Sequence, residues 1–346
     1  MELKNFSLAI GYWRGIAALS ILILHFFPTN SSISWLWVAT DTFFILSGYQ
    51  FMKRNGLKPR FTFNYKVKLI VGRILALLPL LACSIVFRAS LIIIELLKEN
   101  FTGHIGLKSV HLLTQFSYLA ASFFCVQFLH PISIQIFVPL WFITVYFWIY
   151  VFSASVSVTH SLRRVISFIF LGFMLFQISL NLSSDTAGFE VERKWIFLFA
   201  RGIIGFGLGM MVSLVLDFKS NIWISIIFLL CLLLISVVPL IRHIPSGYFI
   251  IETDSIFCIF LTYLLRREKK LAYLTSNIQK LGFFLNKYSY GIYLLHPLLL
   301  ILIPKNFINS HYRSEALLIL IASSIGLSYL LTNLSDYISR RIRSYL

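Results

Sequence analysis

Apolar runs of about twenty residues recur along this chain, and they restrict its fold more than any other feature. A run of that length spans the hydrocarbon core of a bilayer when it forms an α-helix. Charged residues make up only 12% of the chain, whereas soluble domains carry about twice that share. The sequence therefore predicts an all-α polytopic membrane protein. Membrane topology also explains the net charge of +17 better than nucleic-acid binding does, because the basic residues lie between the apolar runs.

The charges between the runs indicate which of them cross the membrane. The candidate spans are residues 8–27, 34–52, 69–97, 112–129, 137–158, 165–182, 195–216, 222–241, 248–265, 287–304 and 315–334. The connections 53–68 and 266–287 are rich in Lys and Arg, so the positive-inside rule places both in the cytoplasm. Both can lie there only if residues 112–129 do not cross. We therefore expect a single domain over 1–346 with about ten transmembrane helices, cytoplasmic termini, and a re-entrant or outer-surface segment near 112–129.

The first run carries two ionisable residues, Arg14 and His25, in the segment RGIAALSILILH. Eleven positions correspond to about three helical turns, so both side chains project from one face, about 16 Å apart along the axis. A neutral imidazole can accept a proton from a hydroxyl nucleophile, which makes His25 a candidate general base. Each residue also has a structural alternative. His25 would then bond a neighbouring carbonyl, and Arg14 would extend to the cytoplasmic interface.

Two later runs carry buried charges of opposite sign, Asp41 and Arg201. A charge inside a span is costly without a partner, so each should face the protein interior. For Asp41 the candidate partners are His25, whose tautomer a carboxylate would fix, or an arginine. Ser47 and Gly48 follow Asp41 in the segment FFILSG, where small residues also allow two helices to approach closely.

Basic residues gather at the cytoplasmic start of the third span, where Arg73 follows Lys66 and Lys68. The forked guanidinium of arginine matches phosphate oxygens, so Arg73 is a candidate for binding the phosphates of an anionic cofactor. The alternative is that these residues only set the membrane topology.

Two further segments combine aromatic and polar residues inside apolar runs. PLWFITVYFW contains Trp141 and Tyr146, and SYGIYLLHP places Tyr293 and His296 one turn apart on a helix face. The proline after His296 is also typical of a simple kink.

The cysteines do not indicate a metal site. They lie within apolar runs, and their spacing is not that of metal ligands: Cys83, Cys125, Cys231 and Cys258. We expect them to be packing residues and expect no bound metal.

The order of these segments resembles the acyltransferase-3 family of integral-membrane O-acyltransferases. The segments that carry the resemblance are RGIAALSILILH, DTFFILSGY, GRILALLP, PLWFITV, ARGIIGFGLGM and SYGIYLLHP. The resemblance covers nearly the whole chain. It implies a ten-helix domain of the bacterial inner membrane. Such a domain moves an acyl group, usually acetyl, from cytoplasmic acetyl-CoA to a hydroxyl of an extracytoplasmic or lipid-linked glycan.

The resemblance also implies roles for the charged residues. In that family the residues matching Arg14 and His25 are essential. His25 would act as general base or carry the acyl group transiently. Arg14 and Arg201 would stabilise donor charge or the developing oxyanion. Asp41 would orient His25, or would serve as a counter-ion in helix packing.

One family motif is complete and two others are not. The complete motif is FFxxSG, which includes Ser47 and Gly48. The first arginine of the cytoplasmic RxxR motif falls on Arg73, but the second falls on Ala76, where Lys66 or Lys68 would have to compensate. Many members carry a glutamate at the position of Tyr146. Its replacement either places the chain in a branch of the family without that carboxylate or removes a residue that assists the acceptor. The apolar residues that follow Trp141 and Phe142 favour the first alternative.

Two alternatives to an acetyltransferase remain open from the sequence. The buried charges would also suit a transporter or flippase for a glycan intermediate, which needs no acyl donor. The residues Ala76 and Tyr146 would also fit an inactive relative that serves as a scaffold.

Overall fold

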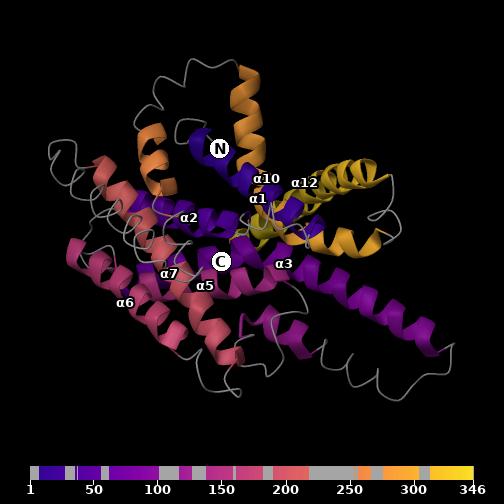
Figure 1. Ribbon diagram of the computed structural model, residues 1–346, viewed down its shortest axis with the longest axis horizontal. Coiled ribbons are helices and arrows are strands. Elements are labelled where there is room, and N and C mark those ends of the chain that lie inside the picture. The colour runs from indigo at the N-terminus through magenta and orange to yellow at the C-terminus, as the bar shows by residue number, and fades with distance from the viewer. Residues whose placement is uncertain are drawn as a thin grey trace. The chain divides into compact units, whose positions relative to one another are not determined.

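The protein is helical throughout the part of the chain that the structure describes. The computed structural model describes residues 8–27, 36, 38–55, 62–100, 117–126, 138–158, 161–181, 190–217, 254, 256–265, 276–303 and 312–345. Nearly all of these residues are helical and none of them lies in a strand, as Figure 1 shows. The predicted all-α class is confirmed.

Long helices account for most of the described chain. They are α1 (Leu8–Phe26), α2 (Ala39–Asn55), α3 (Phe63–Asn100), α5 (Val138–Ser155), α6 (Leu162–Asn181), α7 (Glu190–Asp217), α10 (Ser276–Leu302) and α12 (Arg313–Tyr345). Among the described residues, five of these helices are long and apolar enough to cross a membrane, namely α1, α3, α6, α7 and α12. Shorter apolar helices cover Leu140–Ser155 within α5 and Ile256–Leu265. The chain is therefore a polytopic membrane protein.

Local sequence explains where several helices begin and end. The Oγ1 of Thr62 accepts a hydrogen bond from the Tyr65 amide at 3.4 Å, which caps the start of α3. At the C-terminal end of α2, the Asn55 side chain donates to the Phe51 carbonyl at 2.7 Å. Helix α1 ends just before Pro28, because a proline disfavours the helical conformation in the residue that precedes it.

The chain forms two compact units, each assembled from segments that are far apart in sequence. Unit 1 contains Met1–Phe61, Val156–Ile178 and Phe199–Ser289, and unit 2 contains Thr62–Ser155, Ser179–Leu198 and Tyr290–Leu346.

The core of unit 1 is the contact between α2 and α7. Most residues of α2 are buried, including polar ones, so the protein rather than lipid surrounds this helix. A Cβ added to Gly48 would collide with the backbone carbonyl of Phe206, and one added to Gly209 would collide with that of Ile45. Only glycine permits such an approach between the two backbones.

In unit 2, by contrast, α3 and α12 expose much of their apolar surface. In the apolar windows of these two helices, only 22% and 17% of the residues are buried. Exposed leucine and isoleucine side chains such as Leu318, Ile319 and Leu330 suit contact with lipid.

The relative directions of neighbouring helices test the predicted topology. In unit 1, α1 runs parallel to α10, since Gly282 approaches Leu8 while Gly15 approaches Leu285. Helices α2 and α7 are also parallel, because the neighbours of successive α2 residues advance along α7. In unit 2, α3 runs antiparallel to α5, because Lys66 contacts Ser155 while Arg73, further along α3, lies over Tyr146. The relation of α2 to α7 and that of α3 to α5 require that residues 112–129 do not cross, since one additional crossing would reverse both.

The described part of this non-crossing segment ends inside the protein. Its helix, residues 117–123, is closed by hydrogen bonds from the Val126 amide to Ala121 at 2.8 Å and from the Cys125 amide to Ser122 at 3.1 Å. Cys125 has a φ of 54°, as expected for the left-handed residue that ends such a helix.

The depth of this helix end favours a re-entrant segment over an outer-surface one. Trp148 donates from Nε1 to the Cys125 carbonyl at 2.7 Å. Trp148 lies about 15 Å from the Val138 end of α5 and about 10 Å from the Ser155 end. The segment therefore reaches about the middle of α5.

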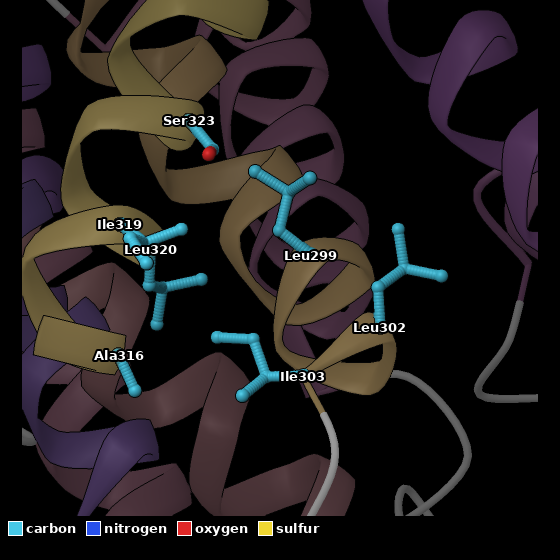
Figure 2. A pocket seen from close by; sticks show the side chains of 7 residues that line it. All are labelled: Leu299, Leu302, Ile303, Ala316, Ile319, Leu320 and Ser323. Carbon is cyan, nitrogen blue, oxygen red and sulfur yellow. The ribbon is translucent and has the colours of Figure 1, made fainter. Parts of the chain in front are cut away.

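An apolar cavity of about 340 Å³ lies between α10 and α12 in unit 2, as Figure 2 shows. Its lining residues are Leu299, Leu302, Ile303, Ala316, Ile319, Leu320 and Ser323. None of these side chains is ionisable, so the cavity lining itself provides no acid–base group.

Candidate functional site

Arg14 is fixed in unit 1 by side chains from two other helices. Its Nη2 donates to Oε1 of Gln50 on α2 at 3.0 Å, and its Nη1 donates to Oδ1 of Asn286 on α10 at 3.3 Å. Both of these acceptors are neutral amides. They orient the guanidinium in a fixed direction, which is the arrangement expected where a negative charge must be stabilised.

His25 lies in the last turn of the same helix and is partly buried. Because α1 continues unbroken from Leu8 to Phe26, the predicted spacing holds, with Arg14 and His25 about 16 Å apart on one face. One rigid helix thus carries both the arginine and the imidazole.

Asp41 forms a buried ion pair with Arg201. The arginine donates from Nε to Oδ1 at 3.0 Å and from Nη2 to Oδ2 at 2.7 Å, although the two residues are 160 positions apart. The exposed fractions of the two side chains are 6% for Arg201 and 0% for Asp41. The sequence allows either His25 or an arginine as the partner of Asp41. In the structure the partner is an arginine, which bonds both carboxylate oxygens.

The sequence analysis missed a third member of this group, Asp254. This residue is only 2% exposed, and it interacts electrostatically with both Asp41 and Arg201. Its Oδ1 has no hydrogen-bond partner within the described residues. The sequence feature that could have identified Asp254 is the presence of an acidic residue near the start of the apolar run 248–265.

Gly48 lies at the contact between α2 and α7, and Ser47 precedes it on α2. Ser47 is buried, and Gly48 lies against the α7 backbone. The structural alternative for Gly48, a close helix contact, is therefore what the geometry shows.

The second group of predicted residues meets in unit 2 around Arg73. The Arg73 guanidinium lies over the ring of Tyr146, with Cζ 4.5 Å from the ring centroid, and 5.8 Å from the centroid of Tyr150. These separations are within the range of cation–π attraction. The position at which many family members are expected to carry a glutamate is thus occupied here by a ring beneath the arginine.

The neighbouring lysines differ in their placement on α3. Lys66 is seven residues before Arg73, so the two share a helix face, and its Nζ donates to the Ser155 carbonyl of α5. Lys68 lies nearly opposite Lys66 around the helix and is exposed. Ala76 is also exposed. Of the two lysines, only Lys66 shares the face of Arg73.

A series of ring contacts joins the remaining predicted residues. Phe142 stacks on Tyr146 with centroids 5.9 Å apart and meets the edge of Tyr293 at 5.2 Å. Tyr293 in turn lies 6.2 Å from the His296 ring, and Trp141 contacts Phe142 at the same separation. The structure thus brings Trp141 and the tyrosines together with Arg73 in one cluster.

His296 is fully buried, and its Nδ1 lies 3.1 Å from the Ile292 carbonyl. Since a carbonyl only accepts hydrogen bonds, Nδ1 carries the proton in this contact. The helix backbone therefore satisfies one ring nitrogen of His296.

Each unit therefore contains one group of polar residues that suits a particular chemistry. Unit 1 carries an imidazole and an arginine fixed on one helix, and unit 2 carries an arginine backed by aromatic rings. Both groups lie among apolar side chains, and such surroundings suit chemistry from which water is excluded.

Comparison with known proteins identifies the family. The model of an acyltransferase family, described as "Acyltransferase domain" (Acyl_transf_3), matches residues 7–333. No curated protein and no solved structure matches the chain. The family match extends over nearly all of the sequence and includes every residue of the two groups. The chain therefore belongs to the acyltransferase-3 family of membrane acyltransferases.

Proposed function

We propose that this protein transfers an acetyl group from cytoplasmic acetyl-CoA to a hydroxyl of a cell-surface or lipid-linked glycan. The observation that carries the proposal is the pair formed by Arg14 and His25 on α1, with Arg14 oriented by two neutral amides. We place the protein in the bacterial inner membrane with both termini in the cytoplasm, in agreement with the basic connections on that side.

The proposed reaction is the exchange of a thioester for an ester. The sugar hydroxyl attacks the acetyl carbonyl, a C–O bond forms and the C–S bond breaks. His25 accepts the hydroxyl proton, and the departing CoA thiolate is protonated in turn. Arg14 lies about 16 Å from His25 along α1, so it stabilises negative charge on the bound donor rather than on the carbonyl that reacts beside His25.

Arg73 is the main residue of the proposed donor site. Its guanidinium bonds phosphate oxygens of the donor, and Lys66 on the same face of α3 adds positive charge. The residues present suit this substrate, because the Nε of Arg73 has no hydrogen-bond partner within the described residues. The exposed Lys68 contributes attraction at longer range.

We assign Asp41 and Arg201 a positioning role. Their two hydrogen bonds join α2 to α7, and α2 also supplies Gln50 to Arg14. The pair thereby fixes the helix that orients Arg14. This supports a packing counter-ion role for Asp41 over direct orientation of His25.

The test replaces His25 with alanine in the full-length protein. We expect surface-glycan O-acetylation, measured by NMR of the purified glycan, to be lost while the protein remains inserted and monodisperse in detergent. Ile16→Ala is the matched control, because Ile16 lies on the same helix and is 45% exposed. Retained acetylation in the His25→Ala variant would refute the proposal.

A second measurement separates the proposal from a conduit or a scaffold. The purified wild-type protein should bind acetyl-CoA and should release CoA when a hydroxyl acceptor is supplied. Neither a flippase nor an inactive relative is expected to do this.

A further inference from the structure

We propose that Tyr290 is a second hydrogen-bond donor to the phosphate groups of the acyl donor, and that the rings of Tyr146 and Tyr150 hold Arg73 in position beside it. The inference rests on the proposed function and adds three residues to its donor site. Neither Tyr150 nor Tyr290 was identified by the sequence analysis.

Two unsatisfied donors carry the first part of this inference. The Nε of Arg73 and the hydroxyl oxygen of Tyr290 are both buried, and neither has a hydrogen-bond partner within the described residues. Leaving such a donor unpaired costs about 1–3 kcal/mol. Two unpaired donors that lie close together therefore suit a ligand that supplies the missing acceptors.

The two donors belong to one electrostatic environment. Tyr290 interacts electrostatically with Arg73 and with Tyr146, and all three residues lie in unit 2. A guanidinium N–H and a phenol O–H are both donors, and one of them is cationic. The matching ligand group is an anion with several acceptor oxygens, such as a phosphate.

The rings explain how Arg73 is held without losing its charge. Tyr146 and Tyr150 are four residues apart on α5, so their side chains lie on the same helix face. Their centroids are 4.5 Å and 5.8 Å from the Arg73 Cζ. A carboxylate in place of Tyr146 would form an ion pair with the guanidinium and compete with a phosphate. A ring attracts the cation but leaves its N–H groups to bond the ligand.

Tyr146 is itself held by packing. Phe142 stacks on its ring with an interplanar angle of 6°, and Tyr293 packs edge-on against Phe142. The ring beneath Arg73 therefore has a fixed orientation. The predicted motif residues therefore surround Arg73 with aromatic rings, and none of these residues carries a carboxylate that could bond it.

The first test measures CoA binding to the purified full-length protein by calorimetry. Tyr290→Phe removes only the hydroxyl and should weaken CoA binding at least about tenfold, as expected for one hydrogen bond to a charged group. Tyr288→Phe, two residues earlier on α10, should bind CoA as the wild type does. Equal CoA affinity in Tyr290→Phe and the wild type would overturn the role of Tyr290.

The second test separates the ring of Tyr146 from its hydroxyl. Tyr146→Leu should bind CoA about fivefold to thirtyfold more weakly than Tyr146→Phe, which keeps a ring beneath Arg73. In steady-state assays, Tyr146→Leu should raise KM for acetyl-CoA with little change in kcat or in KM for the acceptor. Equal CoA affinity of the Phe and Leu variants would overturn the role of the ring.

The outcomes also distinguish this inference from the proposed function. A wild-type protein that acetylates its acceptor while all the tyrosine variants behave normally would overturn only the inference. A wild-type protein that neither binds CoA nor transfers acetyl would overturn both.

Discussion

Neutralising Arg201 should destabilise this protein more than neutralising Asp41. The two side chains are almost fully buried and share two hydrogen bonds of 3.0 and 2.7 Å. Replacing Arg201 with methionine leaves Asp41 without its partner and keeps Asp254 beside it. Breaking a buried ion pair in this way costs about 3–5 kcal/mol.

The opposite change should cost less, because Asp254 remains near the arginine. In Asp41→Asn the amide oxygen still accepts one hydrogen bond from Arg201, and Asp254 supplies a negative charge. We expect a loss of about 1.5–3 kcal/mol, the value of hydrogen bonds to charged groups. The double variant should lose less than the sum of the two single losses, since its second substitution removes a charge that is already unpaired.

The assay is thermal unfolding in one detergent at one heating rate, since membrane proteins commonly unfold irreversibly. At a few degrees per kcal/mol, Arg201→Met should lower the midpoint by roughly 6 °C or more, and Asp41→Asn by roughly half as much. Arg164→Met is the control, because the Arg164 side chain bonds the Val156 carbonyl in a partly exposed site. A midpoint of Arg201→Met equal to that of the control would refute this reasoning.

Three further predictions follow from the packing and the topology. Gly48→Ala should prevent the close contact of α2 with α7 and lower the yield of folded protein in size-exclusion chromatography, whereas Gly326→Ala should not, because nothing lies within 4 Å of its added Cβ; similar yields would contradict the glycine contact. Gln50→Leu removes one of the acceptors that orient the α1 arginine, so kcat should fall about tenfold while the protein remains folded; an unchanged kcat would show that this orientation is not needed. The exposed residues Asn64 and Ser314 begin α3 and α12, so a membrane-impermeant thiol reagent should label Asn64→Cys only from the cytoplasm and Ser314→Cys only from outside. Labelling of both from the same side would refute the proposed orientation.

Much of the fold could be predicted from local properties of the sequence. The length of the apolar runs predicts membrane helices, and the basic connections predict that residues 112–129 do not cross. The parallel pair α2 with α7 and the antiparallel pair α3 with α5 confirm that choice. The sequence left a re-entrant and an outer-surface segment equally open, because hydropathy does not report depth. The contact of Trp148 with Cys125 favours the re-entrant form.

The candidate site was less predictable, because its contacts join residues far apart in the chain. Asp41 had two possible partners, and the choice depended on how α2 and α7 are rotated about their axes. Asp254 lies outside the quoted motifs, and nothing in SYGIYLLHP distinguishes Tyr290 from the other residues, so both emerged only from their neighbours.

The sequence by itself determined that this chain is a helical membrane protein, to which family it belongs, and which polar side chains lie within apolar runs. These properties depend on composition, on the order of motifs and on spacing along a helix. The tertiary structure alone decided that Arg201 neutralises Asp41 while neutral amides orient Arg14, and that aromatic rings rather than a carboxylate hold Arg73. The physical reason is that the energy of a buried charge depends on what lies within a few ångströms of it, and packing between distant helices determines those neighbours.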